Sequence, residues 1–393
     1  MHPIESSPMI FPNPTQLCLE ILPADRDRAK QQSQSFSTPA SRWRAYLNQL
    51  CLSAVLPWLQ QEYDPQAQVW LGMAALPSFW EVVNGVAIAL DNMRFLLIPS
   101  EAIDLDEMRV QQEWIDLPSW AADYYLAVQI EPDEGWVRIW GYATHQQLKI
   151  RGNYDRSDRT YSLDEEDLIA DFNVFWVARQ LCPGEPTRAA IASLPSLSLD
   201  CAENLLARLS ERAVIEPRLA VPFSLWGSLL EHGGWRQRLY EKRLGRQEQW
   251  SVLDWLRGGV SGLAKQMAWE RFELQTASKE GSTEEKAPAI STVLSRQLIV
   301  NHQPYELRAL PLSDPEARIW RFELRSTSLA GSIPRGFKLR LLTEDLQPFE
   351  NNEDIATEAV DRLYVEVAIS PGEGLVWEVE PSPENCDREI LRF

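Results

Sequence analysis

The glycine-containing stretch "LYVEVAISPGEGLVWEVEP" (363–381) has residues spaced as in some phosphate-binding loops. A loop of that kind follows a strand and opens a helix, whose first N–H groups bind the anion. Here Gly372 and Gly374 lie between two alternating, strand-like runs, and Glu373 between them would repel phosphate. We therefore interpret the stretch as the turn of a β-hairpin.

A second glycine-rich stretch, "GGVSGLAK" (258–265), resembles a P-loop but lacks its GK[ST] ending. It does not fit a GxSxG nucleophile elbow either, because Gly262 directly follows Ser261. The sequence predicts a helix broken by glycines.

Metal-binding patterns are also incomplete. The four histidines are far apart in the sequence and form no HExxH motif: His2, His145, His232 and His302. The acidic run "NYDRSDRTYSLDEED" (153–167) has Arg159 where a calcium loop needs a ligand and Thr160 where it needs glycine. We interpret this run as a solvated acidic loop and expect neither a metal nor a cofactor.

Nucleophilic catalysis by a dispersed site is an alternative, because such residues meet only in the fold. Cys182 with His145 is one conceivable pair, although no neighbouring residue supports it. The cysteines are five, scattered and without a CxxC pair, which argues against a disulfide framework or a zinc cage: Cys18, Cys51, Cys182, Cys201 and Cys386. These observations indicate a reducing compartment and favour a protein that is not an enzyme.

Two stretches could bind a partner. On the strand-like run 136–142, alternation places Trp136, Trp140 and Tyr142 on one face with Arg138 among them. If exposed, this face could stack on sugar rings or a peptide. Large exposed apolar patches are uncommon, so we favour a face covered by helices.

The other stretch, "WRQRLYEKRLGR" (235–246), is a basic segment in an acidic chain, with Glu241 as its one acid. Its basic residues are Arg236, Arg238, Lys242, Arg243 and Arg246. They could dock an acidic partner or another part of this chain. Charge runs are more often the solvated face of a helix, here with Trp235 and Leu239 buried, and we favour that interpretation.

The net charge of −19, from 57 acidic and 38 basic residues, disfavours binding to nucleic acid and to anionic membranes. No apolar run is long enough to span a bilayer, and the proline-broken start of the chain has no basic region typical of a signal peptide. We expect a cytoplasmic protein with a protein partner.

The length of 393 residues predicts two or three domains. After an irregular or helical segment (1–37), we expect an α+β domain over 38–183. Its helix begins at Thr38-Pro39, and Trp43, Leu47, Leu50, Ala54 and Trp58 recur along it at helical spacing. Three strands joined by two-residue turns should follow over 79–99, then a hairpin of 124–130 with 136–142.

The period returns to helical over 187–275, where Ser198 can cap one helix and Pro222 can open another that Gly233-Gly234 ends. A third helix begins at Trp235 and a fourth surrounds Trp250. The polar stretch 276–289 predicts a linker. Cleanly alternating runs then predict an antiparallel β-sandwich over 290–393, as in 305–310 and 319–325.

Three long runs carry a family resemblance: "LLIPSEAIDLDEMRVQQEWIDLPSWAADYYLAVQIEPDEGWVRIWGYATHQQLK" (96–149), "YDRSDRTYSLDEEDLIADFNVFWVARQL" (154–181) and "PRLAVPFSLWGSLLEHGGWRQRLY" (217–240). Together they resemble a cyanobacterial domain-of-unknown-function family, number eighteen twenty-two. The resemblance implies no activity, cofactor or catalytic residue.

We therefore predict a multidomain α+β protein that acts as a non-enzymatic interaction or regulatory module. A hydrolase and a carbohydrate- or peptide-binding module are the alternatives.

Overall fold

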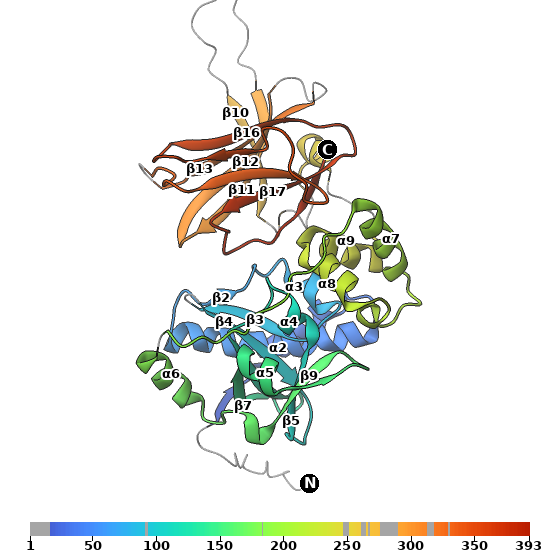
Figure 1. Cartoon of the computed structure of the whole chain (residues 1–393), viewed down its shortest axis with the longest axis vertical. Coiled ribbons are helices and arrows are strands. Elements are labelled where there is room, and N and C mark those ends of the chain that lie inside the picture. The colour runs from blue at the N-terminus through green and yellow to red at the C-terminus, as the bar shows by residue number, and fades with distance from the viewer. Residues whose placement is uncertain are drawn as a thin grey trace, which may run out of the picture. The chain divides into compact units, whose positions relative to one another are not determined.

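Contacts within the chain group its residues into two units (Figure 1). In this computed structural model, unit 1 comprises residues 1–69 and 80–193, and unit 2 comprises residues 70–79 and 194–393. Both units contain helices and β-sheets, which confirms the predicted multidomain α+β class.

The structure describes residues 16–90, 93–182, 184–246, 251–260, 265, 268–275, 290–312, 318–328 and 331–393. The predicted linker (276–289), Trp250 and residues 261–264 of the predicted glycine-broken helix lie outside these residues.

Unit 1 is built on a six-stranded sheet with the order β1-β7-β6-β4-β3-β2. Its strands are β1 (Leu17–Glu20), β2 (Gln68–Val69), β3 (Val86–Leu90), β4 (Met93–Ser100), β6 (Tyr124–Glu131) and β7 (Trp136–Thr144). The predicted hairpin of β6 with β7 is confirmed. All neighbours are antiparallel except β4 and β6, which are parallel. A parallel pair needs a crossover, and this one contains β5 (Glu107–Gln111) and α4 (Gln112–Asp116).

The strand predicted at the start of the 79–99 run is wrong. A short helix, α3 (Leu76–Trp80), ends there, and the chain then bends into β3. Trp80 Nε1 donates to the carbonyl of Gly85 at 3.1 Å, and Gly85 has a φ of +122°, which favours glycine. Asn84-Gly85 therefore forms a bend before β3, and only the β3–β4 hairpin of the predicted meander is present.

Helices cover both faces of this sheet, as predicted. Phe95 of β4 contacts Phe175 of α6 (Phe172–Leu181), with ring centroids 5.1 Å apart. Tyr125 points to the opposite face, because it pairs with Leu96, the residue after Phe95. There the Tyr125 hydroxyl donates to the carbonyl of Trp114 in α4 at 2.6 Å.

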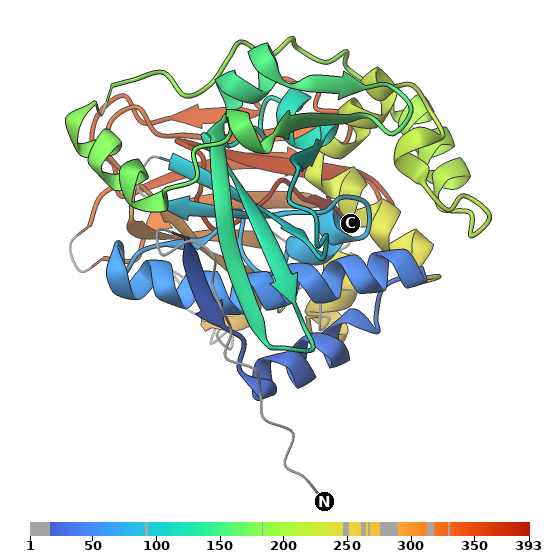
Figure 2. The same ribbon diagram turned by 90° about the horizontal axis from the view of Figure 1, so that it is seen from below.

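The longest helix of unit 1, α2 (Pro39–Glu62), begins where the sequence predicts. Thr38 and Ser41 form a capping box, and Pro39 occupies the first turn. Pro57 does not end the helix, which continues to Glu62. Figure 2 shows α1 (Pro23–Ser33) lying against α2.

A three-stranded sheet, β5-β9-β8, completes the strands of unit 1. The run predicted as a solvated loop forms β8 (Asn153–Asp155), β9 (Thr160–Asp164) and a 3-10 turn, Glu165–Asp167. Its acidic side chains from Asp164 to Asp167 are exposed, as predicted, but the backbone is a hairpin and residues 160–163 are buried, so the prediction of a solvated loop is wrong for that part. The helix α5 (His145–Arg151) precedes this hairpin.

Unit 2 begins with the predicted helices α7 (Leu199–Leu209), capped by Ser198, and α8 (Phe223–Glu231), opened by Pro222. The third helix, α9 (Gly233–Arg243), starts at the glycine pair that we expected only to end α8. The fourth is α10 (Val252–Gly258). The last part of the predicted helical region is instead a strand, β10 (Trp269–Gln275), because it pairs along its whole length with β11 (Ile290–Val300).

Two antiparallel sheets follow. One has the order β10-β11-β12-β13-β16, with β12 (Gln303–Pro311), β13 (Ile319–Ser326) and β16 (Arg362–Ala368). The other has the order β15-β14-β17-β18, with β14 (Lys338–Thr343), β15 (Glu353–Ile355), β17 (Gly374–Glu380) and β18 (Ile390–Arg392). Both contribute to one hydrophobic cluster, which includes Leu307, Phe322, Leu339 and Trp377. That these two sheets pack face to face as a β-sandwich stays a prediction.

The turn at Gly372-Glu373-Gly374 does not close a hairpin, so that prediction is wrong. It connects β16, which pairs with β13, to β17, which pairs with β14 and β18 in the other sheet. A side chain at Gly374 would place its Cβ 2.5 Å from Glu344 Oε2. Close packing against that carboxylate, and not ligand binding, accounts for this glycine.

Glu389 links the strands of both sheets inside unit 2. It is 3% exposed as a side chain and accepts hydrogen bonds from Trp269 Nε1 of β10 at 2.9 Å and Trp377 Nε1 of β17 at 2.7 Å. Its other oxygen lies 2.5 Å from Arg296 Nη1 of β11. One carboxylate thus neutralises a buried guanidinium and satisfies two indoles.

We predict that Glu389→Ala destabilises unit 2 by about 3–5 kcal/mol, because Arg296 would stay buried without a counter-charge. Hydrogen exchange in peptides covering β11 and β17 measures the effect locally. Glu358→Ala, at an exposed position of the same unit, is the matched control and should leave exchange unchanged. Equal protection in both variants would contradict this role of Glu389.

Candidate functional site

The predicted aromatic face of β7 is divided by a β-bulge. Along β6, Ala127 pairs with Gly141 and Val128 pairs with Ile139, so Trp140 is the extra residue. Cross-strand partners share a face: Arg138 pairs with Gln129, and Tyr142 pairs with Leu126. Gln129 and Leu126 are three residues apart on one strand and point to opposite faces. The prediction that Trp136, Trp140 and Tyr142 share a face with Arg138 is therefore wrong for Tyr142.

Two of the predicted aromatic residues are buried. Tyr142 is 3% exposed and packs against Phe175 of α6, with ring centroids 5.7 Å apart. Trp140 is 5% exposed. Trp136 is half-buried and donates to Glu134 at 2.9 Å, while Arg138 donates to Gln129 Oε1 at 2.6 Å. The covered-face interpretation describes Trp140 and Tyr142, and the exposed stacking platform is not present at these two residues.

Trp140 does line an open acidic cleft of about 600 Å³ in unit 1. Its lining residues are Asn84, Ile98, Pro99, Ser100, Ala102, Asp104, Asp106, Glu107, Met108, Arg109, Ala127, Val128, Trp140 and Asp164. Arg109 forms ion pairs with Glu107 (Nε to Oε1, 2.5 Å) and Asp158 (Nη1 to Oδ2, 3.2 Å). Within the described part of the chain, no ion pair reaches Asp104, Asp106 or Asp164. The cleft has an apolar floor and a negative rim, which suits a cationic group.

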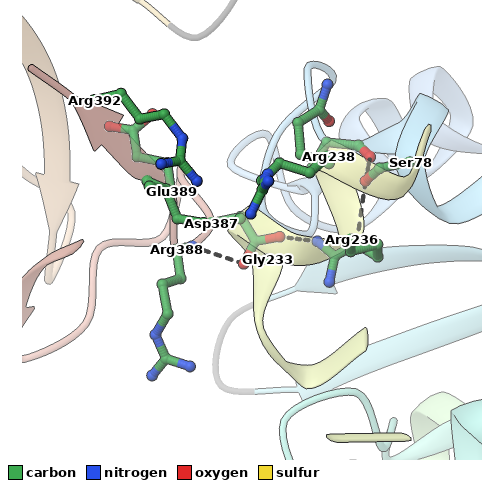
Figure 3. Close-up of a pocket in the computed structure, with 12 residues that line it drawn as sticks. Ser78, Gly233, Arg236, Arg238, Asp387, Arg388, Glu389 and Arg392 are labelled. Carbon is green, nitrogen blue, oxygen red and sulfur yellow. Dashed lines mark hydrogen bonds and ion pairs between the residues drawn. The ribbon is translucent and has the colours of Figure 1, made fainter. Parts of the chain in front are cut away.

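The predicted basic segment forms α9, and three of its arginines are buried inside unit 2. Arg236 is 2% exposed. Its guanidinium forms an ion pair with Asp387, donates to Ser78 Oγ at 3.1 Å and to the Leu230 carbonyl at 2.9 Å, and lies over the Phe79 ring at 3.9 Å. Figure 3 shows Arg236 between Ser78 and Asp387. The interpretation as a solvated helix face is wrong for this residue.

The other basic residues of α9 extend the network. Arg238 Nη1 contacts Glu203 Oε1 of α7 at 2.7 Å and Glu344 Oε1 at 2.6 Å. Arg392 of β18 also contacts Glu344, at 2.8 Å. Arg243, which is 4% exposed, donates to the carbonyls of Leu209 and Val214 at 2.9 and 3.1 Å. Lys242 is half-buried and Arg246 is exposed.

The basic segment could dock an acidic partner or another part of this chain, and its contacts in the structure are with another part of the chain. The cavity beside Arg236 and Arg238 measures about 20 Å³, which is room for about one water molecule. A Cβ at Gly234 would lie 2.5 Å from Ile390 Cγ1, so α9 and β18 are in close contact. This charged cluster holds the unit together and leaves no space for a ligand larger than water.

The conceivable pair of Cys182 and His145 does not have the geometry of a catalytic site. His145 is fully buried, and both of its ring nitrogens contact the backbone. Nε2 lies 2.8 Å from the Ile115 carbonyl, and Nδ1 accepts from the Ala189 N–H at 3.0 Å. Burial lowers the pKa of His145. A neutral ring with both nitrogens engaged cannot take a proton from a thiol, whereas Cys182 is exposed.

Among the described residues of unit 1, the most exposed large aromatic side chain lies in a second cleft, at a position predicted to belong to the apolar stripe of a helix. This aromatic cleft has a volume of about 390 Å³. Its lining residues come from α1, α2 and the β6–β7 turn: Lys30, Ser33, Gln34, Pro39, Arg42, Trp43, Tyr46, Pro132 and Asp133.

Trp43 is the central residue of the aromatic cleft. It is 49% exposed, although it lies one turn before the buried Leu47. Trp43 Nε1 donates to Glu101 Oε2 at 2.6 Å, and its ring lies 5.3 Å from that of Tyr46. The i, i+3 spacing of Trp43 and Tyr46 was the available sequence signal, since it places both on one helix face. Ala102, next to Glu101, lines the acidic cleft, so the hydrogen bond to Glu101 connects Trp43 to a loop that borders the acidic cleft.

Among the described residues, no group of three or more His, Cys, Asp or Glu side chains is arranged to hold a metal ion. Nor does that part of the chain contain a helix of the length and apolar character needed to cross a bilayer.

The buried His232, next to the α9 network, gives a pH-dependent prediction. Burial, with the charges of Arg388 and Arg236, lowers the pKa of His232 to about 3. An unfolded chain binds the proton below a pH of about 6.5, so unit 2 should lose stability as the pH falls from 6.5 towards 3, by a total on the order of 4–5 kcal/mol. Above pH 6.5 this group should have no effect.

His232→Gln is the test, because its amide can still donate to the Glu344 carbonyl that lies 2.9 Å from His232 Nε2. We expect the melting temperature of the wild-type chain to fall more between pH 7.5 and pH 4 than that of the variant. Parallel pH profiles would show that His232 already binds the proton in the folded chain.

Comparison with known proteins gives a family and no function. No curated protein and no solved structure matches the chain. A family model described as "Protein of unknown function (DUF1822)" matches residues 19–392, nearly the whole chain. The protein therefore belongs to the DUF1822 family.

Proposed function

We propose that this chain is a cytoplasmic, non-enzymatic protein-binding module with a regulatory role, and that it binds its partner through the aromatic cleft of unit 1. The observation that carries the proposal is the indole of Trp43, which is half exposed and yet held in place by Glu101. An exposed aromatic side chain that is already fixed loses little conformational entropy when a partner covers it.

The composition of the aromatic cleft supports a protein partner. Trp, Tyr and Arg are the residue types that most often dominate the energy of protein interfaces, and Trp43, Tyr46 and Arg42 all line this cleft. Pro39, which is exposed, adds rigid apolar surface. The side chains of Lys30 and Asp133 supply both charge signs at its border.

The neighbouring acidic cleft suggests which partners are favoured. Its rim carries Asp104, Asp106 and Asp164, and the chain as a whole has a charge of −19. A partner with lysine or arginine near its apolar contact residues would meet complementary potential there, which raises the rate of association.

A sugar-binding role is the second candidate, because an exposed indole can also stack on a sugar ring. This candidate uses Trp43 of α2, whereas the sequence predicted a stacking platform on β7. A hydrolase receives less support, since the thiol and imidazole considered for it are not arranged for proton transfer.

We predict that Trp43→Ala reduces capture of the protein partner about 30-fold or more, the effect of losing an interface hot spot of about 2 kcal/mol. The measurement is quantitative affinity capture from a native lysate with the full chain as bait. The substitution should leave the chain folded, because about half of the side chain is exposed.

Tyr364→Ala is the matched control, since Tyr364 is a 44% exposed aromatic residue of unit 2. A stoichiometric protein captured by the wild-type and Tyr364→Ala baits, and lost with Trp43→Ala, supports the proposal. Equal capture by all three baits, or by none, contradicts it. A glycan-array signal that depends on Trp43 would replace the protein partner with a carbohydrate.

A further inference from the structure

The strand β10 lies at an edge of the five-stranded sheet of unit 2 (Figure 1). Among the described residues it pairs with β11 alone. Its middle residues are exposed: Glu270, Arg271, Phe272 and Glu273. Phe272 is 45% exposed. An edge strand offers unpaired N–H and C=O groups to any chain that can add a strand, and soluble proteins normally protect such edges.

Open space adjoins the first part of this strand. A cleft of about 420 Å³ is lined by Gly259, Val260, Lys265, Trp269, Glu270 and Arg271. The residues that line it therefore include three consecutive residues of β10. An added strand needs room beside the edge, and this cleft supplies it along the first part of β10.

We propose that β10 pairs with β10 of a second copy of this chain, antiparallel and centred on Phe272. In that register Arg271 lies opposite Glu273 of the other copy, and Glu273 opposite its Arg271. The two Phe272 side chains meet on the other face of the sheet. Two five-stranded sheets would then continue into one another across a two-fold axis.

Charge order selects this arrangement over others. Arg271 and Glu273 lie on the same face of β10, with Nη2 and Oε1 3.9 Å apart. Antiparallel self-pairing places an opposite charge directly across from Arg271 and from Glu273. Parallel pairing in register would place Arg271 against its own copy, which is unfavourable. Charged residues on an edge usually prevent association, but here the strand is complementary to itself when reversed.

This inference does not rest on the proposed function, since it concerns unit 2 and a second copy of the chain. The test is sedimentation velocity of the full chain at 0.15 M salt over a concentration series up to roughly 100 µM, suited to a micromolar dissociation constant. We expect the wild-type chain to sediment as a dimer. Arg271→Glu alone and Glu273→Arg alone should each raise the dissociation constant about tenfold or more, because like charges then face each other.

The double variant, Arg271→Glu with Glu273→Arg, restores opposite charges across the axis and should dimerise like the wild type. Its recovery excludes misfolding as the cause of the loss in the single variants. Arg335→Glu makes the same charge change at an exposed position outside the five-stranded sheet and should leave the dimer intact. A monomeric wild-type chain, or a dimer that the single reversals do not weaken, would overturn the proposal.

Discussion

Unit 2 depends on one constraint: the buried arginines of α9 must be neutralised by acidic side chains of the same unit. A buried charge without a partner costs several kcal/mol, so Arg236 needs Asp387, and Arg238 needs Glu344. These contacts tie the helix to the residues around β18 and to the segment that carries Ser78. Gly233 and Gly234 permit the close approach, since a Cβ at either would collide with the residues before β18 or with β18 itself.

The same constraint decides where binding surfaces can lie. Most arginines of the basic segment are buried inside unit 2, next to a cavity with room for about one water molecule. Exposed functional groups are found instead at two other places. In unit 1 they lie at Trp43 and along the acidic cleft. In unit 2 they lie on the edge strand β10. The proposed recognition of other proteins therefore uses fixed aromatic and acidic groups and not the arginines.

Local sequence signals predicted much of the fold. Caps and prolines located α2, α7 and α8, and alternation located β6, β7, β12 and β13. Features set by distant contacts were missed. The extra residue Trp140 turns Tyr142 to the other face of the sheet, and no alternation pattern reveals a bulge. Arg236 and Arg238 read as solvated because their acids, Asp387 and Glu344, lie over 100 residues away. Trp43 matched the apolar stripe of α2, yet its bond to Glu101 keeps it at the surface.

Arginine-selective labelling of the native chain, read residue by residue with mass spectrometry, tests the central claim most directly. The account predicts that Arg236, Arg238 and Arg243 stay unmodified in the folded chain and react only after denaturation, whereas the exposed Arg42 and Arg335 react at once. Labelling of the α9 arginines as fast as Arg42 in the folded chain would contradict it. Their charges would then be available to an acidic partner.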